Sequence, residues 1–189
     1  MQQTTKQNHR LRGVGLALFM LPFLLFTQTA ASVQTCNASV SAITPSSDFA
    51  LHNDGTVTHN TTGLMWKVCS EGQTWDAGSC TGTTTVHTWD AALQIPQSLN
   101  SGGGYPISPN YTDWRLPNVQ ELKSIAELKC AFPAINETVF PSIPSSQYWS
   151  SSPNALNNDK AWGVYFNYGY VSFYSRNLGY RVRLVRSGQ

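Results

Sequence analysis

The chain has 189 residues, with 12 Lys and Arg against 10 Asp and Glu, and aromatic residues are as frequent as charged ones at 12% each. This length fits a single domain with a substantial core. Few charges combined with many aromatics exclude an intrinsically disordered chain, which needs low hydrophobicity and high net charge.

The N-terminal 31 residues have the three parts of a secretory signal peptide. Residues 1–12 hold three basic residues and no acid, residues 13–26 are almost wholly apolar, and small neutral residues follow. The apolar run is shorter than the about 20 residues that span a bilayer comfortably. We therefore expect cleavage after Ala31, with an uncleaved N-terminal anchor as the alternative.

Export changes the charge of the protein. The signal carries three of the 12 basic residues, which leaves nine against ten acids in the mature chain. The basicity belongs to the signal, so it gives no argument for a nucleic-acid partner. We expect a periplasmic, cell-surface or extracellular protein without a permanent membrane span.

The four cysteines, Cys36, Cys69, Cys80 and Cys130, all follow the signal. An even count in an oxidising compartment predicts two disulfides, and three pairings are possible. The Gly-rich polar segment between Cys69 and Cys80 favours that pair as a loop closure. Cys36–Cys130 would then tie the N-terminal segment to the body. A zinc site is the alternative, but the spacings contain no C-x-x-C motif.

The first half of the mature chain predicts an extended lead-in over 32–50, a hairpin and a helix. Asp54-Gly55 marks a turn before an alternating run up to His59, and residues 60–63 form a second turn before a strand over 64–69. Thr88 is a good N-cap for a helix over 89–100. Apolar spacing predicts a second helix up to residue 129, which Asn118 and Glu121 begin with a capping box.

The second half predicts a proline-rich loop over 131–147 and a short strand over 148–151. Runs over 161–166, 170–175 and 180–186, separated by two turns, predict a three-stranded antiparallel meander. Period-2 alternation places Trp162, Val164 and Phe166 on its core face with Val171 and Phe173. Val182 and Leu184 of the third run belong to the same face.

Five segments together resemble the C-terminal domain family of the Lcl collagen-like adhesins. They begin with the run from Asp54 to Trp66 and continue with Trp89–Ala92 and Asp113–Leu122. The strand Tyr148–Ser152 and the end from Trp162 to Arg186 complete the pattern.

The resemblance implies a C-type-lectin-like α+β domain over 51–187, with two helices packed on antiparallel sheet. It also implies a surface module, in some members an adhesin for sulfated polysaccharide. The fold is distantly akin to the formylglycine-generating-enzyme domain.

The face of the meander opposite the core is the candidate ligand site. Its residues would be Tyr165, Tyr170, Tyr174, Arg181 and Arg183. Tyrosine rings stack on sugar rings, and Arg offers a planar donor fork to sulfate or carboxylate. The alternative is a scaffold role, in which loops cover this face and the arginines bond loop carbonyls.

A polar turn is the candidate metal site. Asn154, Asn157, Asn158 and Asp159 supply oxygen ligands of the kind that Ca²⁺ prefers, but only one of them is a carboxylate. No other cofactor is expected.

No catalytic grouping stands out, because no serine lies in a nucleophile elbow and no carboxylates pair. We therefore expect a non-catalytic exported module that binds polysaccharide or a surface protein. One alternative is a structural part of a surface or pilus-like apparatus. The other is a divergent enzyme related to the formylglycine-generating enzyme.

Overall fold

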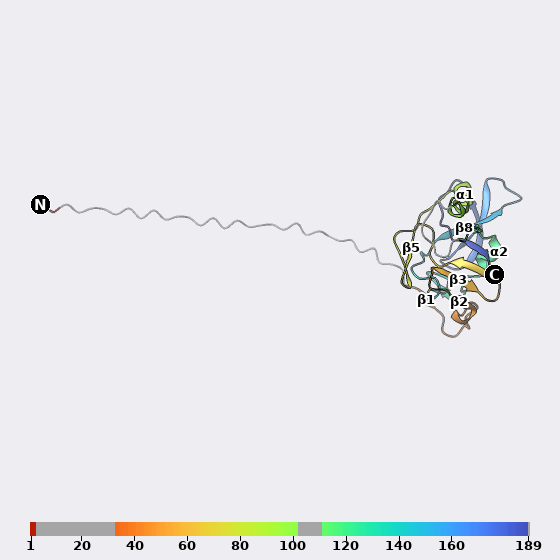
Figure 1. The fold of residues 1–189 in the computed structure, drawn as a ribbon, viewed down its shortest axis with the longest axis horizontal. Helices are drawn as coiled ribbons and strands as arrows, with labels where there is room; N and C mark the ends of the chain where they lie inside the picture. The colour runs from red at the N-terminus through yellow and green to blue at the C-terminus, as the bar shows by residue number, and fades with distance from the viewer. Residues whose placement is uncertain (3–32, 102–110, 189) are drawn as a thin grey trace. The chain divides into compact units, whose positions relative to one another are not determined.

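The computed structural model describes residues 1–2, 33–101 and 111–188 (Figure 1). The chain divides into two units, Met1–Ala31 and Ser32–Gln189, and all that follows concerns the second. Apart from Met1 and Gln2, the predicted signal peptide lies outside the described residues. Within those residues, no helix is both long enough and apolar enough to cross a bilayer.

A four-stranded antiparallel sheet joins the two ends of the domain. Its order is β11 (Val185–Ser187), β4 (Leu64–Lys67), β3 (Thr56–His59) and β2 (Phe49–Leu51). The predicted hairpin of β3 and β4 is confirmed. Its entry turn is fixed by Asp54, whose carboxylate accepts hydrogen bonds from the Thr56 amide at 2.9 Å and hydroxyl at 2.6 Å.

A three-stranded antiparallel meander forms the second main sheet. It consists of β8 (Gln147–Pro153), β9 (Lys160–Tyr165) and β10 (Tyr170–Ser175), with β9 in the centre. The predicted meander is therefore confirmed, but its third strand is β8. Residues 180–186 do not form a continuous strand of this sheet. Tyr180 forms an antiparallel bridge with His87, Arg181 forms a parallel bridge with Tyr148 of β8, and Val185 joins the four-stranded sheet.

Two helices accompany the sheets. Helix α1 (Trp89–Asn100) has the predicted bounds, but Thr88 at its N-cap makes no side-chain capping bond. Helix α2 (Val119–Lys123) begins with the complete predicted capping box. It ends at Lys123, not at residue 129. Ser124 donates its hydroxyl proton to the Glu121 carbonyl, and the chain after it leaves the helix to pair at Ala126.

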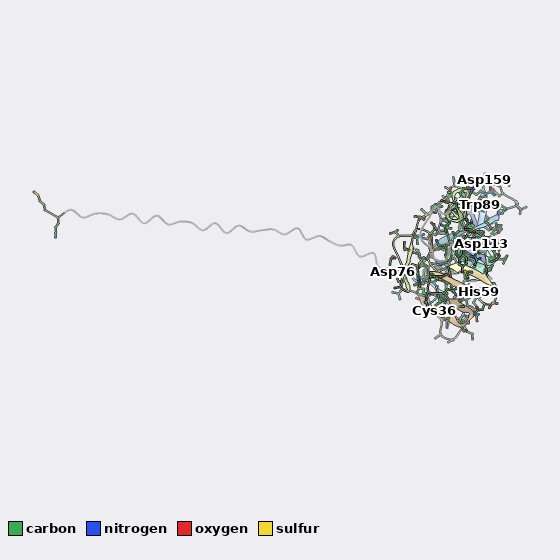
Figure 2. All side chains as sticks on the ribbon, viewed as in Figure 1. Cys36, His59, Asp76, Trp89, Asp113 and Asp159 are labelled. Carbon is green, nitrogen blue, oxygen red and sulfur yellow. A yellow bond between two sulfur atoms is a disulfide. The ribbon has the colours of Figure 1, made fainter. Side chains whose placement is uncertain are left out.

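Both favoured disulfides are confirmed. Cys36–Cys130 links β1 (Thr35–Cys36) to β7 (Cys130–Ala131), where the two cysteines are direct register partners. Cys69–Cys80 ties the end of the first hairpin to the ribbon of β5 (Thr74–Asp76) and β6 (Ser79–Thr81). Figure 2 labels Cys36 at the end of the domain opposite Trp89 and Asp159.

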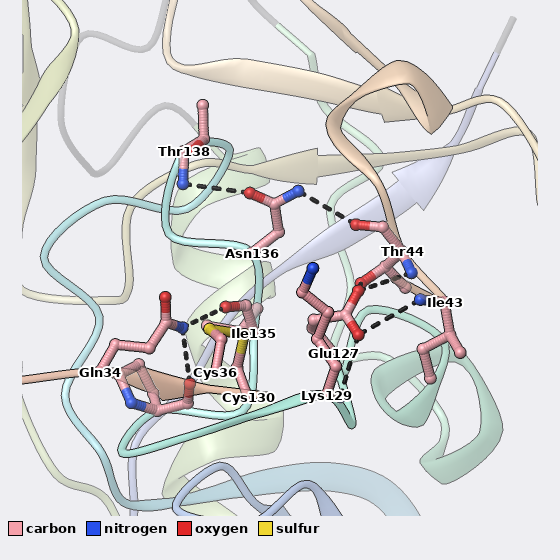
Figure 3. Close-up of a disulfide and its surroundings, with 11 residues drawn as sticks. Gln34, Cys36, Ile43, Thr44, Glu127, Lys129, Cys130, Ile135, Asn136 and Thr138 are labelled. Carbon is pink, nitrogen blue, oxygen red and sulfur yellow. Dashed lines mark hydrogen bonds between the residues drawn. A yellow bond between two sulfur atoms is a disulfide. The ribbon is translucent and has the colours of Figure 1, made fainter. Parts of the chain in front are cut away.

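The lead-in is held to the body by a carboxylate as well as by the disulfide (Figure 3). It contains β1 and a short 3-10 helix, Ser46–Asp48. Buried Glu127 accepts hydrogen bonds from the amides of Ile43, Thr44 and Lys129 and from the Thr44 hydroxyl. Burial opposes ionisation, but these donors outweigh it and lower the pKa of Glu127.

The buried side chains form two clusters, one on each side of the meander. The first joins the four-stranded sheet and α2, and includes Trp66, Leu122, Val164 and Phe166. The second gathers around α1 and includes Trp89, Trp149 and Ala161. Each face of the meander is therefore covered in part, and no residue of β10 is fully buried.

Candidate functional site

The clearest exposed feature is a group of three tyrosines on the β9–β10 hairpin. Tyr165 and Tyr170 are direct register partners, and their rings meet at 5.3 Å. Tyr168 lies in the turn between them, 6.4 Å from Tyr170 with the two rings only 12° from parallel. Tyr168 and Tyr170 are 52% and 47% exposed. We call these three residues the tyrosine patch.

The turn that carries the tyrosine patch is packed firmly onto the body. Gly169 has a positive φ of 72°, and a Cβ added there would meet Leu128 at 2.7 Å. Lys123 donates to the Gly169 carbonyl, and Phe132 packs edge-on against Tyr168 at 4.9 Å. The rings are therefore presented in a fixed arrangement, which lowers the entropy cost of binding.

Tyr174 lies apart from the tyrosine patch. Its ring packs against Tyr180 at 4.8 Å and Trp149 at 6.1 Å, on the side of the meander that α1 covers. Burial, reinforced by neighbouring tyrosines, raises the pKa of Tyr174 to about 12. Tyr174 lies on the predicted face with Tyr165 and Tyr170, but the second core cluster partly covers that end of the face, so Tyr174 is half-buried.

Arg181 lies at the edge of the meander. Its backbone amide donates to the Gln147 carbonyl at 3.1 Å, and Gln147 is the register partner of Tyr165. The half-buried guanidinium donates to the hydroxyls of Thr84 at 2.8 Å and Ser146 at 2.5 Å. Arg181 is thus placed one strand away from the tyrosine patch, with part of its donor fork already used.

Arg183 is interior, and its predicted place on an exposed face is wrong. It is 1% exposed. Its guanidinium donates to the carbonyls of Lys67 and Val68 and to the Ser70 hydroxyl, and lies 4.7 Å over the Phe140 ring. Desolvation, partly offset by the phenol of Tyr148, lowers its pKa to about 10. These contacts match the scaffold alternative for this arginine.

The predicted core face of the meander is buried at one end only. Val164 and Phe166 are fully buried, but Phe173 is 43% exposed and Trp162 is half-buried. Their rings meet at 5.3 Å, and the Lys160 ammonium lies 4.7 Å over Phe173. This second aromatic surface was missed, since alternation gives the face of a residue but not the length over which that face is covered.

The predicted calcium turn uses half of its oxygens internally. The Asn154 side chain accepts from the Leu156 amide and that of Asn157 from the Asp159 amide, each at 3.0 Å. Asn158 and Asp159 remain to line an open groove. Two side chains are far fewer than the six to eight oxygens that Ca²⁺ takes. These residues therefore do not fit a calcium site by themselves.

All four cysteines are disulfide-bonded. Across the described ranges, no group of three or more His, Cys, Asp or Glu side chains is placed to hold a metal ion. The surfaces described above offer aromatic rings and hydrogen-bonding groups.

The comparison with known proteins agrees with this architecture. The model of the Lcl C-terminal domain matches residues 55–186, which include every strand from β3 to β10, both helices and both surfaces just described. No curated protein matches the chain.

Proposed function

The chain belongs to the Lcl C-terminal domain family, and from that premise we propose that it is an exported, non-catalytic module that binds polysaccharide through the tyrosine patch. Its two disulfides suit an oxidising compartment. The observation that carries the proposal is the pair of half-exposed, nearly parallel rings of Tyr168 and Tyr170. The exposed parts of these rings offer the apolar CH groups of a sugar ring an aromatic partner.

Arg181 adds a charged contact for acidic or sulfated chains. It lies beside Gln147 at the edge of the same sheet, and two of its nitrogens are held by Thr84 and Ser146. Such anchoring orients the guanidinium before a ligand arrives. An anionic polymer would gain from this residue while stacking on the tyrosine patch.

Affinity electrophoresis in gels that contain dextran or dextran sulfate tests the proposal. Tyr170→Ala should abolish the retardation that the unchanged protein shows. Phe173→Ala is the matched control, because Phe173 lies on the same strand with similar exposure but faces the other way. Arg181→Ala should weaken retardation by dextran sulfate only. Equal retardation of Tyr170→Ala and the unchanged protein would contradict the proposal.

Exposed Phe173 and half-buried Trp162 favour a second candidate, a contact with protein in a surface assembly. Aromatic side chains are enriched at protein interfaces, and exposed apolar patches often mark them. In that case Phe173→Ala, and not Tyr170→Ala, should reduce cross-linking to surface proteins on intact cells. Cross-linking that neither change reduces would count against this candidate.

A further inference from the structure

An open polar groove lies at the end of the domain where Figure 2 labels Trp89 and Asp159. Its volume is about 620 Å³, within the range of about 300–1,000 Å³ typical of ligand sites. The loop between β8 and β9, the end of β10 and the start of α1 form its walls. Its lining residues are Thr88, Asp90, Asn158, Asp159, Ser175, Arg176 and Asn177.

The backbone of Arg176 ties the walls of the groove together. Its amide donates to the Asp159 carbonyl, and its carbonyl accepts from the Trp89 amide, each at 2.9 Å. The β8–β9 loop, β10 and α1 are thus linked through one residue. The groove is therefore held by main-chain bonds, which a substitution of its exposed side chains leaves in place.

The Arg176 side chain is also held in position. Its guanidinium lies 4.1 Å over the Trp89 ring, and its Nε donates to the Lys160 carbonyl at 3.3 Å. These two contacts hold the planar group while its terminal nitrogens make no other hydrogen bond within the described residues. A guanidinium that is held in place, with N–H donors still available, suits recognition of oxygen atoms on a ligand.

Several hydrogen-bond acceptors of the groove also have no partner within the described residues. In the part of the chain that the structure describes, the carboxylates of Asp90 and Asp159 make no hydrogen bond and no ion pair. Thr88, at the N-cap of α1, makes no capping bond with its hydroxyl. The groove thus combines two carboxylates, one guanidinium, amides and hydroxyls.

We infer that this groove binds an uncharged, hydroxyl-rich sugar unit, at a site separate from the tyrosine patch. Adjacent hydroxyls of a sugar both donate and accept, which matches carboxylates and a guanidinium set side by side. An apolar ligand is disfavoured, since no apolar side chain of the described residues lines the groove. An anionic sugar is disfavoured because two carboxylates outnumber one guanidinium.

Sugar binding at the groove rests on the proposed function, but it depends on other residues and can be tested by itself. Methyl glucoside, methyl galactoside and methyl mannoside serve as neutral probes and glucuronate as the anionic probe. Titrations followed by the amide NMR signals of Asp159, Arg176 and Asn177 report on the groove. We expect at least one neutral glycoside to shift these signals at millimolar concentration, and glucuronate to bind about tenfold more weakly at low salt.

One double variant and one matched control decide the assignment. Asp159→Asn and Asp90→Asn together should weaken binding of the neutral glycoside and reduce the preference over glucuronate severalfold, because the repulsion is removed. Asp76→Asn changes an exposed aspartate of β5, far from the groove, and should change neither quantity.

Two results would overturn the assignment to the groove. One is that no neutral glycoside shifts its signals, and the other is that glucuronate binds as tightly as the neutral probes. A silent groove with intact tyrosine-dependent dextran binding would remove the groove site alone. Glycoside binding in the groove, with no effect of Tyr170→Ala on dextran, would remove the tyrosine site alone.

Discussion

The β9–β10 hairpin and the closing segment over 180–187 are neighbours in the chain and use the same residue types in opposite ways. Both alternate aromatic, aliphatic and polar side chains. The hairpin turns Tyr168 and Tyr170 toward water, while the closing segment buries Arg183 to 1% exposure. A long cation at a strand position therefore does not mark a surface unless the neighbours of that strand are known.

The reason for the difference is topology. The hairpin lies in one regular sheet, so each face follows the alternation of its strands. The closing segment passes between two sheets: Arg181 lies beside β8, and Val185 pairs with Trp66 of β4. Arg183 lies between Arg181 and Val185 in the chain. Its buried guanidinium donates to the carbonyls at the end of β4 and so links the closing segment to that strand.

Replacement of Arg183 should have the largest effect on stability. Arg183→Met removes the donor from the carbonyls of Lys67 and Val68 and from the Ser70 hydroxyl. Buried acceptors without a donor cost about 1–3 kcal/mol each, so we expect the free energy of unfolding to fall by about 3–5 kcal/mol. Urea denaturation measures it.

Arg181→Met is the control for that comparison. It removes bonds to two hydroxyls at a half-exposed site, and it should cost no more than about 1 kcal/mol. If Arg183→Met and Arg181→Met lower the free energy of unfolding equally, the contrast between an interior Arg183 and an edge Arg181 is wrong.

A smaller effect should separate the two tyrosines of β10. Tyr174→Ala leaves a gap beside Trp149 and Tyr180, and we expect a loss of about 2–3 kcal/mol, below the cost for a fully buried aromatic residue. Tyr170→Ala removes a ring that is about half exposed, and should change the stability by less than about 0.5 kcal/mol. Thermal unfolding at neutral pH compares them directly. A loss for Tyr170→Ala equal to that for Tyr174→Ala would show that the tyrosine patch is part of the core.

Local signals in the sequence predicted the elements well. The Asp54-Gly55 turn, the Asn118 capping box and the start of α1 all depend on residues within a few positions of each other, and all three are present in the structure. The disulfides followed from the compartment and from the loop-like character of one intervening segment. The family was recognised from the residues of the five matching segments, and the α+β class was what that resemblance implied.

Features that depend on distant partners could not be predicted in this way. The second helix stops at Lys123 because Ala126 pairs with Ile135. The residue pattern of the helix itself gives no sign of this pairing. Alternation assigned the faces of the meander correctly, as the register of Val164, Tyr165, Phe173 and Tyr174 shows. It did not predict that Phe173 is exposed and Tyr174 half-buried, because cover by neighbouring elements begins and ends partway along a strand. The polar groove combines residues separated by almost 90 positions, and only its Asn158 and Asp159 portion carried a signal.

The smallest expected effect is on how the free energy of unfolding depends on pH above about 10. It tests the burial of Tyr174 without removing the ring. The pKa of Tyr174 is raised to about 12 in the folded protein by burial, against about 10 in an unfolded chain. Between these values the unfolded state binds fewer protons than the folded state, so stability falls as pH rises from about 10.

Tyr174→Phe should make that fall less steep, while stability near neutral pH stays equal or rises slightly. Its buried hydroxyl has no hydrogen-bond partner within the described residues, so its removal strands nothing. Tyr148, Tyr180 and Arg183 titrate in both proteins, so they cancel in the difference between the two urea series. Tyr170→Phe on the same strand removes one of the neighbouring tyrosines that help to raise the pKa of Tyr174, so it should lessen the slope by less than Tyr174→Phe does. If Tyr174→Phe does not change the pH dependence of the free energy of unfolding, Tyr174 is exposed to water in the folded protein. The division of the meander into a covered end and an exposed end would then be wrong.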